Sequence, residues 1–141
     1  MKIVNPLAPT SRFIEHRCGI FSVDASYAPL WAKQNITYVP VRDSIWTVSN
    51  GIYRTIFVEG ATSLIAFDTF ESPGAARSFK RVMQRVFPLK PVRTLIYSHD
   101  HLDHCGYASE ITEGGDILAH RLCDTVVRAR RAPQQYFPNE V

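Results

Sequence analysis

The sequence predicts an α/β domain with a mixed sheet and flanking helices, and three observations support this fold class. Between positions 36 and 67, short β-branched and aromatic runs alternate with turn residues, which is the pattern of an antiparallel meander. Positions 73–87 then carry apolar residues at the spacing of a helix with one buried face. The apolar run at 92–97 follows this helix, so the crossover favours a strand in a mixed or parallel sheet.

The chain of 141 residues is long enough for one domain with its own core. We expect an irregular N-terminal extension over 1–35 and the domain itself over 36–141. The extension contains several prolines and shows no sustained period, apart from a short strand predicted at 19–23. His16 and Cys18 lie in the extension and are interpreted as packing or surface residues.

The individual elements follow from turn signals and periodicity. The Asn50-Gly51 pair predicts a hairpin, and Ser72 followed by Pro73 predicts the start of the long helix. Strands are expected over 37–41, 45–49, 52–59, 63–67, 92–97 and 116–119. A short helix is expected over 106–113, and a final helix over 121–131, with Leu122, Val126 and Ala129 facing inward.

Composition and charge exclude several classes of function. The net charge of +3 is small, so we expect no nucleic-acid partner; the cluster of Arg128, Arg130 and Arg131 is interpreted as a solvated helix end, with an anionic partner as the alternative. The three cysteines are widely spaced and odd in number, which is typical of a reducing compartment. We find no signal peptide and no apolar stretch of about 20 residues, so we expect a cytoplasmic protein without membrane contact.

Three of the five histidines, His99, His101 and His104, lie within six residues and are interleaved with Asp100 and Asp103. On a helix these side chains would point in different directions. In an extended segment, residues i and i+2 lie on the same side about 6.5 Å apart, so two imidazoles could bind one ion. A helix beginning just after them would turn Asp103 and His104 toward a second ion. Imidazole and carboxylate ligands suit zinc first, and iron or manganese next.

A single histidine at a strand end is usually structural or exposed, whereas three with a carboxylate after a buried strand indicate a metal site. The segment 99–104 also resembles the H-x-H-x-D-H signature of the metallo-β-lactamase superfamily. The resemblance covers about residues 37–137, including the strand that ends in Asp68-Thr69. It implies an αββα sandwich of which this chain would be the N-terminal half. The amino-acid sequence of segment 96–104 resembles that of alkylsulfatase-like and lactonase-like hydrolases more than that of the β-lactamases themselves.

The resemblance also implies roles for individual residues. His99 and His101 would belong to a first metal site, and Asp103 and His104 to a second. Asp103 would also be catalytic, steering the hydroxide or the leaving-group proton. Asp68 would support the site by orienting a histidine, the alternative being a strand-end turn former. By the same comparison His120 is structural, and Cys105 is a small helix residue rather than a ligand.

The activity implied by the resemblance is that of a metal-dependent hydrolase. A metal-activated hydroxide, held by two zinc ions in the complete domain, would attack a small-molecule ester, lactone, thioester, sulfate or phosphate. Two departures from the family pattern fall close to the expected metals. Phe70 and Tyr107 stand where the family often has glycine, and both can reshape the pocket.

The remaining ligands of the family lie later in the chain, and the only histidine after His104 is His120. We therefore expect an incomplete chain whose sheet has one uncovered apolar face, with self-association or a missing C-terminal half as the partner. That face would include Ile56, Val58, Leu64 and Ile65 or their alternates. The alternative functions are a catalytically inactive fragment, a metal-binding or interaction subunit, and an iron-dependent redox member of the same fold.

Overall fold

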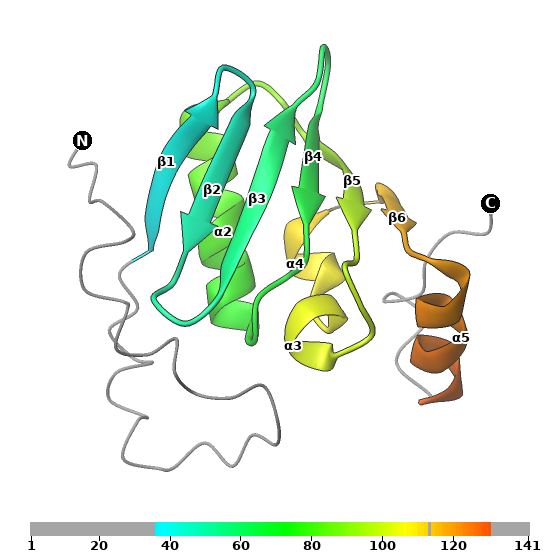
Figure 1. Cartoon of the computed structure of the whole chain (residues 1–141). Helices are drawn as coiled ribbons and strands as arrows, with labels where there is room; N and C mark the ends of the chain where they lie inside the picture. Colours follow the sequence, from blue (N-terminus) through cyan, green and yellow to red (C-terminus); the bar gives the residue numbers. More distant parts are fainter. Residues whose placement is uncertain (1–35, 113, 131–141) are drawn as a thin grey trace.

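The structure is a computed structural model that describes residues 36–112 and 114–130. The predicted extension over 1–35, with its strand at 19–23 and with His16 and Cys18, lies outside the described residues, and so does Arg131. The described residues form a six-stranded sheet in the order β1-β2-β3-β4-β5-β6, with helices beside it (Figure 1).

The sheet is mixed, as the sequence predicts. Its strands are β1 (Thr37–Arg42), β2 (Ile45–Ser49), β3 (Arg54–Glu59), β4 (Leu64–Phe67), β5 (Val92–Ile96) and β6 (Asp116–Leu118). The pairs from β1 to β4 are antiparallel, because tight turns join them. The pairs β4–β5 and β5–β6 are parallel, because a helical connection carries the chain back to the same end of the sheet before each new strand.

The helices are α2 (Pro73–Val86), α3 (Leu102–Cys105), α4 (Ala108–Ile111) and α5 (Arg121–Ala129). At the start of α2, the Oγ of Ser72 accepts a hydrogen bond from the backbone N of Ala75, which confirms the predicted cap. The short helix expected over 106–113 is present as α4 but is shorter than predicted, and α3 was not among the expected elements. The chain forms a helical turn as early as Leu102, turns at Gly106, and begins a second helical turn at Ala108. A Cβ on Gly106 would lie 2.5 Å from the backbone O of Leu102, so this tight turn requires glycine.

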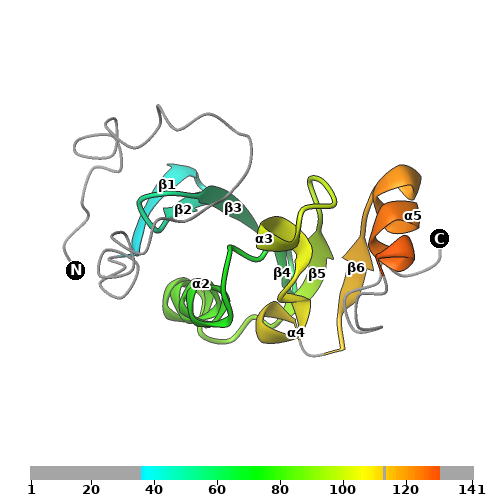
Figure 2. The same cartoon turned by 90° about the horizontal axis from the view of Figure 1, so that it is seen from below.

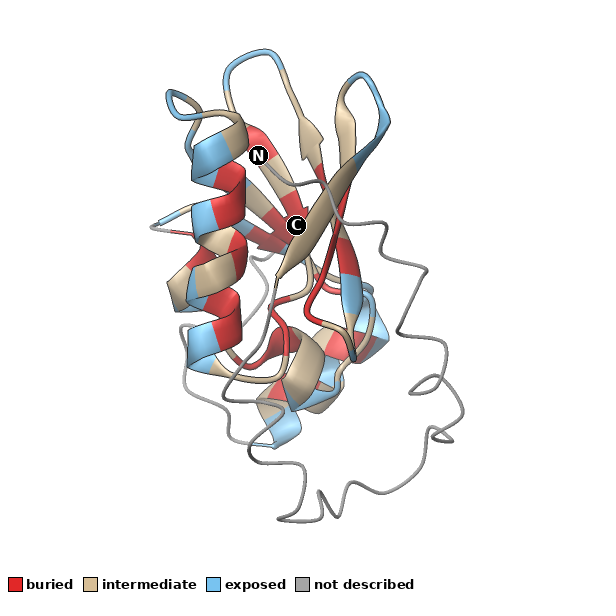
Figure 3. Ribbon diagram, turned by 90° about the vertical axis from the view of Figure 1, so that its left-hand side faces the viewer, coloured by how far each residue is buried: buried red, intermediate tan, exposed pale blue. Residues whose placement is uncertain are grey.

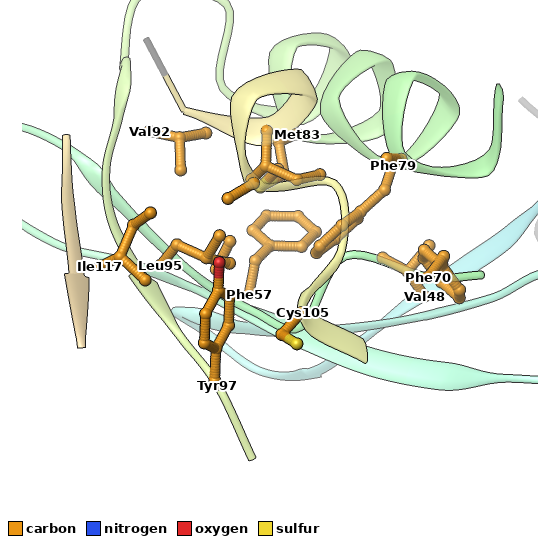
Figure 4. Packing of buried hydrophobic residues seen from close by; sticks show 14 of the residues in the cluster. Val48, Phe57, Phe70, Phe79, Met83, Val92, Leu95, Tyr97, Cys105 and Ile117 are labelled. Atoms are coloured by element: carbon orange, nitrogen blue, oxygen red, sulfur yellow. The ribbon is translucent and has the colours of Figure 1, made fainter. Parts of the chain in front are cut away.

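The core lies between the sheet and α2. Figure 2 shows α2 and α4 on the same side of the sheet, and Figure 3 shows that the buried residues of α2 lie on the side of the helix that faces the strands. Phe57 in β3 lies close to Phe79 of α2 (Figure 4), with its ring centroid 6.2 Å from that of Phe79. Its ring centroid is also 6.2 Å from those of Trp46 and Phe87. The predicted apolar stripe of α2 is therefore the buried one, with Phe79 and Met83 fully enclosed.

The opposite face of the sheet carries Ile56, Val58 and Ile65, which are half-buried. The prediction that Leu64 belongs to this face is wrong, because Leu64 is fully buried on the side of α2. The register explains the difference. Phe57 pairs with Ala66 and Val58 pairs with Ile65, so even-numbered residues of β4 lie under the helix and Ile65 lies on the other face.

The C-terminal helix α5 buries a different stripe from the one predicted. Cys123 and Val127 face inward, whereas Leu122 is 64% exposed and Ala129 is exposed. In a helix of nine residues both stripes have helical spacing, and the packing of Cys123 and Val127 into the core selects between them. None of the helices in the described part of the chain combines the length and hydropathy needed to cross a membrane.

Candidate metal centre

The histidine-rich segment occupies the loop 97–101 and the short helix α3, beyond the carboxyl ends of the parallel strands β4 and β5 (Figure 1). Hydrogen bonds continue past these strand ends. The N of Asp68 donates to the O of Ile96 at 3.0 Å, and the N of Tyr97 donates to the O of Leu118 at 2.9 Å. The residues that follow β4 and β5 are therefore held side by side, at the edge where open α/β sheets bind ligands.

The three imidazole rings come together at this edge. The ring centroid of His99 lies 4.8 Å from that of His101 and 4.2 Å from that of His104. The Oδ2 of Asp103 lies 3.6 Å from the Nε2 of His104. The backbone of His101 is extended and α3 begins at the next residue, so the chain passes from extended to helical within the motif as the sequence predicts.

Asp68, directly after β4, organises the polar groups around these rings. Its Oδ1 accepts from the backbone N of Ser98 at 2.8 Å, and its Oδ2 accepts from the Oγ of Ser98 at 2.7 Å. The same Oδ2 lies 3.0 Å from the Nδ1 of His104. Asp68 therefore lies beside the ring of His104, and its role in orienting that ring for a metal stays a prediction.

Ser98 extends this network to a second ring. Its Oγ lies 2.9 Å from the Nδ1 of His99. Because the single hydroxyl proton is donated to Asp68, the oxygen accepts from His99, which assigns the Nδ1–H tautomer to this ring. His104 likewise donates through Nδ1 to Asp68. In both neutral rings the lone pair is then on Nε2, the nitrogen left for another partner.

The electrostatics of the cluster follow from these contacts. Burial acts to raise the pKa of the Asp68 carboxyl, but hydrogen bonds with His104 and Ser98 outweigh it, so the pKa lies below its ordinary value. The hydrogen bond with Asp68 raises the pKa of His104 against the opposing effect of burial. Burial and the neighbouring imidazoles of His104 and His101 lower the pKa of His99. The pKa of the His104 ring is thus raised, whereas that of the neighbouring His99 ring is lowered.

Thr69 and Phe70 connect the end of β4 to the motif. The backbone N and the Oγ1 of Thr69 both donate to the O of His104, at 2.8 and 3.1 Å, and the N of Tyr107 donates to the Thr69 Oγ1 at 3.3 Å. Phe70 has a φ of 66°, a conformation that favours glycine, yet it is buried and its ring contacts Phe79 edge-on. Phe70 therefore combines a left-handed backbone with an aromatic side chain that packs in the core.

The loop between β2 and β3 contributes Tyr53, which the sequence reasoning missed. The Tyr53 ring meets the His104 ring edge-on, with centroids 5.5 Å apart. Asn50 shapes this loop because its Oδ1 accepts from the N of Ile52 and Tyr53, and its Nδ2 donates to Glu71 at 2.8 Å. The Asn50-Gly51 signal predicted the hairpin but not that its loop reaches the histidine cluster.

Two further residues have the structural positions expected of them. Cys105 is fully buried in α3, and burial raises the pKa of its thiol to about 12, which makes it a poor ligand or nucleophile. His120 caps α5, where its Nδ1 accepts from the N of Leu122 at 3.3 Å.

The donor chemistry of the cluster fits a transition-metal ion. It offers imidazole nitrogens and a carboxylate, and the Nδ1–H of His104 is bound to Asp68, as is usual for histidines that ligate metals. Within residues 36–112 and 114–130, however, no three His, Cys, Asp or Glu side chains are arranged so that they could hold one ion together as they stand. The described residues therefore provide suitable donor atoms but not a closed metal site.

The fold and the site define an α/β protein with a histidine and aspartate cluster at the carboxyl ends of parallel strands. A sequence profile of the metallo-beta-lactamase superfamily matches residues 50–121, and the chain belongs to this superfamily. Members of the superfamily are mostly hydrolases and typically bind metal ions. The predicted family and fold class are thus confirmed.

Curated relatives are similar over most of this chain. It is 44% identical over 124 residues to the 2,4-dinitroanisole O-demethylase subunit alpha of Nocardioides sp. strain JS1661, covering 87% of this chain and 37% of that protein. It is 32% identical to the subunit beta, covering 81% and 36%. The alkyl/aryl-sulfatase BDS1 of Saccharomyces cerevisiae is 32% identical, covering 62% and 14%. The chain therefore spans little more than a third of either demethylase subunit.

Solved structures show the same fold at low identity. The metallo-beta-lactamase from Pontibacter korlensis superposes with a TM-score of 0.61 at 11% identity, covering 74% of this chain and 51% of that one. This likeness concerns the fold alone. It agrees with the expectation that the chain corresponds to about half of a metallo-β-lactamase domain.

Proposed function

We propose that the chain provides part of the metal centre of a metal-dependent hydrolase, with His99, His101, Asp103 and His104 as ligands. The observation that carries this proposal is the convergence of three imidazoles, of which His99 and His104 have tautomers set by Asp68, through Ser98 in the case of His99. Zinc bound there, as one or two ions, would supply the Lewis acidity that lowers the pKa of a water molecule. Iron or manganese would suit the same donors.

The chain's own residues then hold and move protons. Asp68 keeps the Nδ1 proton on His104, and through the hydroxyl of Ser98 it supports the same tautomer of His99. Asp103 lies in the first turn of α3, half-buried and next to Nε2 of His104. Its carboxylate is the group that we assign to steering the attacking water or the proton of the leaving group.

For the substrate we infer a small molecule with an oxygen-linked leaving group, such as an aryl alkyl ether or a sulfate ester. The support is the similarity to proteins named as a dinitroanisole demethylase subunit and an alkyl/aryl-sulfatase. Hydrolysis of an aryl methyl ether consumes one water and yields a phenol and methanol, so it needs no oxidant. A nitro-substituted ring stabilises the departing phenolate.

Release of a coloured nitrophenolate tests this proposal directly. The full chain would be supplied with zinc and assayed with 2,4-dinitroanisole, 4-nitrophenyl sulfate and 4-nitrophenyl acetate. We expect turnover of at least one of them, abolished by His101→Ala and kept by the matched control His120→Ala, since His120 caps α5. Turnover that is unchanged in His101→Ala would reject the assigned ligands.

We further propose that a second sheet covers the face that carries Ile56, Val58 and Ile65. The support is that the chain covers about half of the solved metallo-β-lactamases and about a third of the demethylase subunits. The second sheet would come from further polypeptide or from a partner chain. Size-exclusion chromatography with a dye that binds apolar surface tests this. A monodisperse monomer without dye uptake would contradict it.

A further inference from the structure

Arg130, the residue that ends α5, contacts Asp100 twice. Its Nη1 donates to the backbone O of Asp100 at 2.8 Å, and its Nη2 lies 2.8 Å from the Asp100 Oδ2. One planar guanidinium thus holds both the main chain and the side chain of a single residue. A lysine, which is a point charge on a flexible stem, could not reproduce this pair of directional contacts.

Asp100 occupies the position where such a contact matters most. It lies between His99 and His101 in the loop that joins β5 to α3. Its backbone O also accepts from the Sγ of Cys105 in α3 at 3.5 Å. The peptide group between the two imidazoles is therefore held from two different helices.

The neighbouring arginine shows that this contact is not a general property of the helix end. The Nε of Arg128 donates to Asp124 at 2.7 Å, one turn earlier in the same helix. Arg128 therefore supports α5 itself, whereas Arg130 reaches a loop 30 residues away in the sequence. Both side chains are partly exposed, as expected of a solvated helix end, but Arg130 also contacts a loop outside its own helix.

The exposure of the pair indicates what it contributes. The side chains of Arg130 and Asp100 are 44% and 27% exposed, and ion pairs at such sites add little to folding stability. A bidentate contact in a loop still restricts the positions that the loop can adopt. We therefore expect loss of this contact to change the geometry of the loop more than the free energy of unfolding.

We propose that Arg130 is a positioning residue for the metal centre: by holding Asp100 it fixes the backbone between His99 and His101, so that both imidazoles meet the same ion. This inference rests on the proposed function. It adds a residue of α5 to the support of the centre, alongside Asp68 at the end of β4. Outer contacts of this kind typically change metal affinity by about 10–100-fold.

The test uses the full chain and two metals. Zinc affinity is measured by competition with a chromophoric chelator, and cobalt(II) is used to record the visible absorption bands that report coordination geometry. Arg130→Ala should bind zinc about 10-fold more weakly and alter the cobalt bands. Arg130→Lys should fall between this variant and the wild type. The control Arg128→Ala should keep the wild-type affinity and bands, and thermal melts should show both alanine variants folded.

Wild-type affinity and cobalt bands in Arg130→Ala would overturn the inference, as would an equal loss in Arg128→Ala. If Arg130→Ala does not fold, Arg130→Lys and Asp100→Ala are judged by the same criteria. A wild-type chain that binds neither metal would contradict the proposed function itself. Metal binding by the wild type with no dependence on Arg130 would contradict only the present inference.

Discussion

The Oδ2 of Asp68 and the Nδ1 of His104 lie 3.0 Å apart and join the end of β4 to the helical turn that carries the second half of the histidine motif. The pKa of Asp68 is lowered and that of His104 is raised, so the contact favours the charged form of both side chains. It leaves Nε2 as the remaining ring nitrogen of His104.

Replacing Asp68 with asparagine should weaken zinc binding by about 10–100-fold, because the amide removes the charge that holds the Nδ1 proton on His104. The measurement is chelator competition in the full chain. Asp124→Asn is the matched control, since Asp124 pairs with Arg128 on α5. Equal affinities of Asp68→Asn and Asp124→Asn would show that Asp68 is only a turn former.

Replacing Ser98 with alanine should remove the preference of the His99 ring for the Nδ1–H tautomer. The ring is neutral at pH 7.5, because burial and the nearby imidazoles lower its pKa. In the wild-type, metal-free chain, nitrogen chemical shifts of labelled histidine should show the proton on Nδ1, and in Ser98→Ala they should show a mixture. A wild-type ring with its proton on Nε2 would refute the hydrogen-bond directions assigned to Ser98.

Phe70 should tolerate glycine better than alanine, although alanine is larger. Either change removes the buried ring, and Phe70→Ala should lower the free energy of unfolding by about 3–5 kcal/mol. Glycine relieves the left-handed backbone at φ 66°, a strain of about 1–2 kcal/mol. Urea unfolding should therefore find Phe70→Gly about 1 kcal/mol more stable than Phe70→Ala. The reverse order would mean that the backbone at this position carries no strain.

Cys105 should resist alkylation at pH 8 as long as the chain is folded. Burial raises its pKa to about 12, so the folded thiol stays protonated while an unfolded thiol ionises near its ordinary value of 9.0. It follows that the folded state loses stability as the pH rises from about 9 toward 12. Iodoacetamide labelling mapped by mass spectrometry should find Cys105 modified quickly only in guanidinium. Rapid labelling of the native chain would contradict its burial in α3.

Much of the fold could be predicted because local signals determine it. The Asn50-Gly51 pair, the Ser72-Pro73 start and the stripe of α2 each specify their own element without reference to distant residues. The errors arose where local signals were ambiguous. The helix α5 has two apolar stripes of helical spacing, and its packing against the rest of the chain selected Cys123 and Val127. The helix expected over 106–113 is shortened to Ala108–Ile111, because Gly106 makes a tight turn before it.

The residues of the candidate site also divide into those that local sequence signals predicted and those that they did not. The close spacing of four residues predicted them as metal ligands: His99, His101, Asp103 and His104. Asp68 was predicted from the family resemblance. Tyr53 and Arg130 reach the motif from a hairpin loop and from the last helix. Neither position has a local pattern that marks it, because their contacts depend on how the strands are ordered and where α5 lies.

The metal content of the purified chain decides whether the histidine cluster binds metal. The full chain would be grown with zinc, iron and manganese, purified without chelators, and its metal content determined by mass spectrometry beside the variants His101→Ala and His120→Ala. The account predicts at least one equivalent of a transition metal in the wild type and in His120→Ala, and a clear loss in His101→Ala. A metal-free wild type, or equal metal in His101→Ala, would contradict it.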